Sequence, residues 1–87
     1  MLFRSYLAYR GLGNYYLKTK QYDKADSYYS TAIEINPSRF GPIYKNRGLV
    51  RMSQNKNKEA KQDFEDYLKY SPNAKDKDSI VQAIKEM

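Results

Sequence analysis

The chain repeats itself at an interval of 35 residues. Aligning residues 6–39 with the sequence that follows pairs identical residues at four positions and similar residues at four more. The identical pairs are Tyr9 and Tyr44, Gly13 and Gly48, Ala25 and Ala60, and Pro37 and Pro72. The similar pairs are Arg10 and Lys45, Leu17 and Met52, Tyr29 and Phe64, and Ile33 and Leu68. A chain of 87 residues that contains two copies of one unit has little length left for any other architecture.

Apolar residues recur at helical spacing within each unit, and the polar residues 19–21 interrupt the first unit. Each unit is therefore predicted to be a helix, a short turn and a second helix. Asp23 and Asn57 are the predicted N-caps of the second helices, because their side chains accept hydrogen bonds from first-turn N–H groups. The prolines after Asn36 and Ser71 are predicted to end those helices. The four helices are expected over residues 5–19, 22–35, 41–54 and 57–70.

Small residues predict where the two helices of a unit cross. Glycine in the middle of a helix costs about 1 kcal/mol relative to alanine, so Gly13 and Gly48 are expected to allow close approach of another backbone. Ala25 and Ala60 are the small residues predicted to face them. The large aromatic residues at the repeating positions are then predicted to fill a thin core around each crossing, with the tyrosine hydroxyls at its solvent-exposed edge. These are Tyr9, Tyr16, Tyr29 and Tyr44, whereas some of Tyr6, Tyr15, Tyr22 and Tyr28 could instead face a partner or a further repeat before Met1.

At these positions the sequence resembles the tetratricopeptide repeat, a 34-residue helix–turn–helix unit. The first unit carries the whole pattern, as Tyr9, Leu12, Gly13, Tyr16, Ala25, Tyr29, Ala32 and Pro37. The second unit departs from it, with Arg47, Arg51 and Tyr67 where Leu, Tyr and Ala are usual, and one extra residue, Phe40, separates the units. The resemblance implies one all-α domain over residues 1–87, with two stacked helix–turn–helix hairpins, about 6–39 and 41–74, in an α-solenoid.

A fifth helix is expected at residues 76–87, because Ile80, Ala83, Ile84 and Met87 form one apolar stripe there. The bulky Tyr67 stands where the family has a small residue that receives the next repeat. We therefore expect a capping helix that covers the open end of the second repeat. The alternative is the first half of a truncated third repeat.

The resemblance implies that the first helix of each hairpin lines a concave face that binds peptides. Seven residues are aligned with that face: Arg10, Asn14, Lys18, Lys45, Asn46, Leu49 and Met52. Amide side chains such as Asn14 and Asn46 can pair with peptide N–H and C=O groups, and cations attract carboxylates. Arg10, Asn14 and Asn46 also match part of the family's carboxylate clamp. Its third contribution is missing, since the corresponding region offers Ser79 and Ala83.

Composition narrows the function further. The chain has no Cys and no His, so disulfides, thiolate metal sites and imidazole catalysis are excluded, and neither an enzyme activity nor a cofactor is expected. The expected partner is a protein or peptide, with no small-molecule substrate. A net charge of +6 favours acidic partners, and nucleic acid is the alternative because several basic residues cluster in the second repeat. They are Lys45, Arg47, Arg51, Lys56, Lys58 and Lys61.

Two further expectations concern assembly and location. Two repeats fall short of the three or so that usually give a stable array, so weak self-association is a third possibility. No apolar run reaches the roughly 20 residues of a membrane span, and no secretion signal is recognisable. The cytoplasm is slightly favoured, although a removed signal or anchor would leave no trace.

Overall fold

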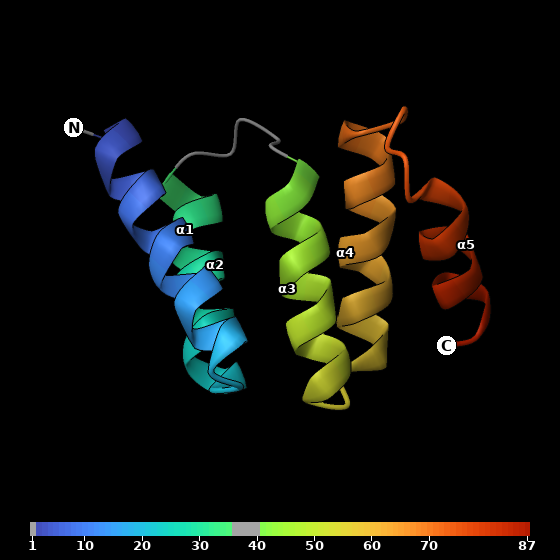
Figure 1. The fold of residues 1–87 in the computed structure, drawn as a ribbon, viewed down its shortest axis with the longest axis horizontal. Coiled ribbons are helices and arrows are strands. Elements are labelled where there is room, and N and C mark those ends of the chain that lie inside the picture. Colours follow the sequence, from blue (N-terminus) through green and yellow to red (C-terminus); the bar gives the residue numbers. More distant parts are fainter. Residues whose placement is uncertain (1, 36–40) are drawn as a thin grey trace.

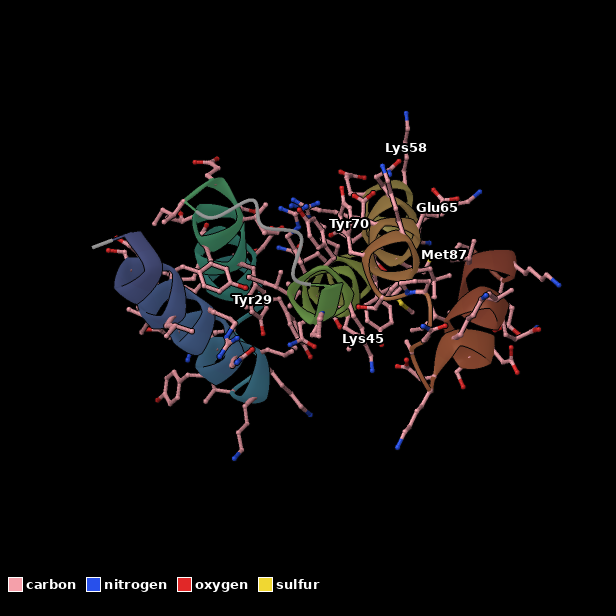
Figure 2. The ribbon with its side chains drawn as sticks, turned by 90° about the horizontal axis from the view of Figure 1, so that it is seen from above. Tyr29, Lys45, Lys58, Glu65, Tyr70 and Met87 are labelled. Carbon is pink, nitrogen blue, oxygen red and sulfur yellow. The ribbon has the colours of Figure 1, made fainter. Side chains whose placement is uncertain are left out.

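The computed structural model describes residues 2–35 and 41–87, and these residues form five helices and no strand. Figure 1 shows the helices side by side in chain order, with the N-terminus at α1 and the C-terminus at α5. Seen from above in Figure 2, α1 and α3 form one layer and α2 and α4 the other. The fold is an all-α solenoid of two hairpins and a final helix. The helices are α1 (Leu2–Lys18), α2 (Tyr22–Ile35), α3 (Gly41–Ser53), α4 (Asn57–Tyr70) and α5 (Lys77–Lys85).

The two hairpins have the same turn at positions 35 residues apart. Lys20 and Asn55 both adopt the left-handed conformation, with φ of 61° and 63°. The next residue then closes the helix end, because the Gln21 N–H bonds the Tyr16 carbonyl and the Lys56 N–H bonds the Arg51 carbonyl, both at 2.8 Å. The 35-residue period predicted from the sequence is thus present in the backbone.

The predicted N-caps are wrong by one or two residues. Helix α2 begins at Tyr22, which places Asp23 within its first turn. Helix α4 begins at Asn57, its N-cap is Lys56, and no side chain makes the capping hydrogen bond. The reason is that a single residue, Gln21 or Lys56, lies between the left-handed residue of each turn and the helix, and it occupies the position of the cap. The predicted stop at Ser71 is confirmed, whereas Asn36, Pro37 and Phe40 lie outside the described residues.

Aromatic rings are the groups closest to Gly13 and Gly48. A Cβ added at Gly13 would lie 2.5 Å from the Tyr29 ring, and one added at Gly48 would lie 2.8 Å from the Phe64 ring. The predicted backbone approach opposite Ala25 is therefore corrected. Ala25 and Ala60 are fully buried, but the atoms nearest to the glycines belong to Tyr29 and Phe64.

The aromatic core is only partly as predicted. Tyr29 and Tyr44 are buried, while Tyr9 and Tyr16 are half-buried. Among the tyrosines left open, Tyr6 is buried and Tyr15 is the most exposed of the large apolar side chains, at 57%.

Helix α5 packs on α4 and covers the outer end of the second hairpin. Ile80 is its buried residue, and Ile84 and Met87 also pack against the core. Tyr67 is buried, and its hydroxyl donates a 2.6 Å hydrogen bond to Asp76, at the start of α5. The large ring thus fills the place where a following repeat would otherwise dock.

The glycine contacts predict opposite effects for the same substitution in one helix. Gly13→Ala should lower the free energy of unfolding by about 1–3 kcal/mol, because the new methyl group overlaps the Tyr29 ring. Gly11→Ala should raise it by about 0.5–1 kcal/mol, since nothing lies within 4 Å of its Cβ position and alanine favours the helix. Urea unfolding of both variants checks this. Equal effects of the two would contradict the described contact.

Candidate functional site

The seven residues predicted to line a groove come from α1 and α3, and two of them, Asn14 and Asn46, contact one another. The Asn46 amide donates to Asn14 Oδ1 at 3.3 Å, and the Tyr29 hydroxyl donates to the same oxygen at 2.5 Å. Burial raises the pKa of Tyr29 to about 12, so its hydroxyl remains a proton donor at neutral pH. We call the side of α1 and α3 that points away from α2 and α4 the α1/α3 face.

Apolar side chains border this amide pair. Leu49 and Met52 on α3 are 38% and 39% exposed. Leu7 on α1 is 38% exposed and lies on the same side as Asn14 and Lys18 by helical spacing. The sequence analysis missed Leu7, although its position seven residues before Asn14 could have indicated it.

The basic residues of the face differ in what they contact. Arg10 is half-buried, with its guanidinium carbon 5.8 Å from the centre of the Tyr6 ring. Lys18 is exposed in the last turn of α1. Lys45 points away from the layer of α2 and α4 in Figure 2 and forms an ion pair with Asp76.

Lys45, Asp76 and Tyr67 together attach α5 to the second hairpin. Asp76 accepts hydrogen bonds from both partners, and these bonds lower the pKa of its carboxyl group. Burial raises the pKa of Tyr67 to about 12, with the carboxylate of Asp76 adding to the effect. Lys45, predicted as a cation for an acidic ligand, thus already has a carboxylate of its own chain.

A buried group of charges joins the two hairpins behind the α1/α3 face. Arg47 donates to both oxygens of Asp63, at 3.0 and 2.7 Å, and to Ser30 at 3.2 Å. Arg51 donates to Asp63 at 3.2 Å and pairs with Asp26 at 3.3 Å. Asp63 and Asp26 are only 1% and 8% exposed. We call Asp26, Arg47, Arg51 and Asp63 the junction network.

Burial alone would lower the pKa of Arg47, but the hydrogen bonds and charge of Asp63 outweigh it and raise the pKa. From the sequence alone, Arg47 and Arg51 are departures from the repeat pattern and part of a basic cluster. Their pairing with acidic residues of α2 and α4 was not predicted. The available signal was Asp63, an acidic residue one position before the motif residue Phe64 and therefore close to the core.

The junction network changes the meaning of the basic cluster. Of its six residues, Lys45, Arg47, Arg51 and Lys56 are ion-paired within the chain. Lys58 and Lys61 are exposed on α4, with Glu59 between them. The cluster is therefore largely compensated, which weakens the case for a phosphate backbone as the ligand.

A hollow in the described part of the chain lies away from this face. An open pocket of about 510 Å³ separates the turn of the first hairpin from the turn of the second. None of the seven predicted residues lines it. The lining residues are Gln21, Tyr22, Asp23, Lys24, Ser53, Gln54 and Lys56.

Residues 2–35 and 41–87 hold no cluster of three or more acidic, His or Cys side chains that could bind a metal ion. Within the same described ranges, no helix is both long and apolar enough to cross a membrane.

Comparison with known families matches both units. Two models described as tetratricopeptide repeat match residues 6–39 and residues 42–74. The chain therefore belongs to the tetratricopeptide repeat family, which generally mediates protein–protein interaction and is a non-catalytic module. A comparison with curated proteins found no match.

The junction network predicts a large effect for a small change. Asp63→Asn should leave Arg47 and Arg51 without their buried carboxylate and destabilise the fold by about 3–5 kcal/mol. A domain of this size has a net stability of only a few kcal/mol, so circular dichroism should show a largely unfolded chain. The exposed Glu65→Gln is the matched control and should melt like the parent. A folded Asp63→Asn variant with an unchanged melting temperature would count against the network.

Acid should weaken the attachment of α5 through Asp76. The pKa of Asp76 is lowered from its ordinary value of 3.8, so its contribution to stability is complete above that value. The contribution is lost as pH falls through the lowered pKa. Thermal unfolding between pH 2 and 6 should therefore show a smaller acid loss in Asp76→Asn than in the parent. Asp78→Asn, at an exposed position two residues later, should keep the parent's full pH dependence.

Proposed function

We propose that the α1/α3 face binds an extended peptide segment of a partner protein, with preference for acidic or carboxylate-containing sequences. In this reading residues 1–87 form one domain of two repeats, about 6–39 and 41–74, closed by a capping helix at about 76–87. The ligand would contact Arg10, Asn14, Lys18, Lys45, Asn46, Leu49 and Met52.

The separation of charge between the two layers carries the proposal. Helices α1 and α3 contain six basic residues and no acidic residue. Helices α2 and α4 contain four basic and seven acidic residues. Lys45, Arg47 and Arg51 are paired with carboxylates of this chain, so the favourable potential that a carboxylate meets over the α1/α3 face comes mainly from the basic residues of α1. The basic residues of α1 and α3 are Arg4, Arg10, Lys18, Lys45, Arg47 and Arg51.

The central amides support a peptide as the ligand. Asn14 Oδ1 and Asn46 Nδ2 are already bonded to one another. The second polar atom of each amide, Asn14 Nδ2 and Asn46 Oδ1, is an N–H donor and an oxygen acceptor that a ligand can use. An extended backbone offers the same two groups, and Leu49 and Met52 offer apolar contact beside them.

A soluble peptide library screened on the isolated domain tests the proposal. Acidic peptides should be enriched, and Lys18→Glu should weaken the affinity of the best one at least tenfold by fluorescence anisotropy. Lys61→Glu makes the same change of charge at an exposed site of α4 and should alter the dissociation constant less than twofold. Enrichment of no peptide, or equal losses in the two variants, would remove the α1/α3 face as the binding site.

A further inference from the structure

Because the two hairpins repeat at an interval of 35 residues, their equivalent faces can be compared. One such face is covered by a helix in the second hairpin but not in the described part of the first. In the second hairpin this face contains Ile43, Val50 and Asp63, which are 2%, 0% and 1% exposed. Helix α2 covers it, as the hydrogen bonds from Arg47 to Ser30 and from Arg51 to Asp26 show. The face therefore docks one helix of the neighbouring hairpin.

The equivalent face of the first hairpin is uncovered in the described structure. The residues 35 positions before Ile43, Arg47, Val50, Arg51 and Asp63 are Ala8, Leu12, Tyr15, Tyr16 and Tyr28. We call these five residues of the first hairpin the outer face. Tyr15 and Leu12 are 57% and 39% exposed, and Ala8 is also exposed. Figure 1 shows α1 and α2 at the end of the row of helices, with no described helix beyond them.

The side chains of the outer face are ordered for apolar contact. Tyr16 and Tyr28 stack with their ring centres 5.5 Å apart and an interplanar angle of 7°, and Tyr9 stacks with Tyr28 at 6.0 Å. These rings are held in place by their neighbours before any partner binds. A preformed aromatic surface loses little conformational freedom on binding.

The chemistry of a fitting partner follows from the substitutions between the two hairpins. The charged residues Arg47, Arg51 and Asp63 correspond to Leu12, Tyr16 and Tyr28. A helix on the outer face therefore meets apolar groups where α2 meets ions. The cation beside the face is Lys24, whose Nζ lies 5.3 Å from the centre of the Tyr16 ring, and α1 contains no acidic residue.

We propose that the outer face docks one amphipathic α-helix of a partner protein, with an apolar stripe opposite Leu12 and Tyr16 and carboxylates along the edge near Lys24. This site is separate from the peptide-binding α1/α3 face. A second copy of the chain is the less suitable occupant, because pairing two outer faces would bring together two Lys24 side chains without a carboxylate from α1.

Two helix-stabilised synthetic peptides test this. Both have the sequence of α2, Tyr22–Ile35, with Tyr29→Glu to remove the apolar side that α2 packs against Gly13. The first also carries Asp26→Leu and Ser30→Leu, which replaces the polar residues that meet the junction network. The second keeps Asp26 and Ser30. The leucine peptide should bind at least tenfold more tightly by fluorescence anisotropy.

Variants of the domain then locate the binding. Leu12→Glu should weaken binding of the leucine peptide at least tenfold, and so should Tyr15→Glu, which provides a second variant if the first melts early. Ser27→Glu adds the same charge to the exposed side of α2 and should change the dissociation constant less than twofold. Amide chemical-shift changes should centre on Ala8, Leu12 and Tyr28.

Three results would overturn the proposal. One is equal or absent binding of the two peptides at millimolar concentration. Another is loss of binding in Ser27→Glu to the same degree as in Leu12→Glu, or shifts centred on the α1/α3 face. The third is concentration-dependent sedimentation of the unliganded domain that Leu12→Glu abolishes, because the occupant would then be a second copy of the chain.

Discussion

The contact of Arg47 and Arg51 with Asp63 and Asp26 fixes how the two hairpins stack, and the other features of the molecule depend on that stacking. Removing these ions from water costs several kcal/mol per ion, and a single loose ion pair would not offset that cost. Asp63 instead receives three hydrogen bonds from two arginines. Those three bonds lie within the second hairpin and hold both arginines in place, while the arginines reach α2 of the first hairpin through Ser30 and Asp26. A shift of one hairpin along the other would therefore break the bonds to Ser30 and Asp26. The charges therefore define one register, which an apolar interface of the same size would define less strictly.

Within each hairpin a different contact sets the spacing of the helices. Gly13 and Gly48 lack the side chain that would keep the rings of Tyr29 and Phe64 away, so each ring lies directly on the helix opposite. The Tyr29 hydroxyl then reaches through the hairpin to Asn14 on the α1/α3 face. A core residue thus orients a residue that is a candidate for ligand binding, and packing and recognition share one side chain.

The sequence predicted the helices well because their period, turns and proline stops are local signals. Helices α2 and α4 begin and end where expected, and the family and the all-α fold are confirmed. The prediction that another backbone comes closest to Gly13 and Gly48 was wrong, since spacing along one helix does not say which group of the partner helix reaches it. The junction network and the bond between Lys45 and Asp76 were missed for a related reason. Both join residues 12 to 31 positions apart on different helices, and their pairing depends on how those helices pack.

The unequal charge of the two layers has a consequence that acts before any contact is made. Because one layer is basic and the other is predominantly acidic, the molecule carries an electric dipole across its thickness. A negatively charged partner exerts a torque on such a dipole and turns the α1 and α3 side toward itself during diffusion. This orienting effect extends over a screening length of about 8 Å at physiological ionic strength. Encounters are thereby biased toward productive orientations, and the bias fades as salt is added.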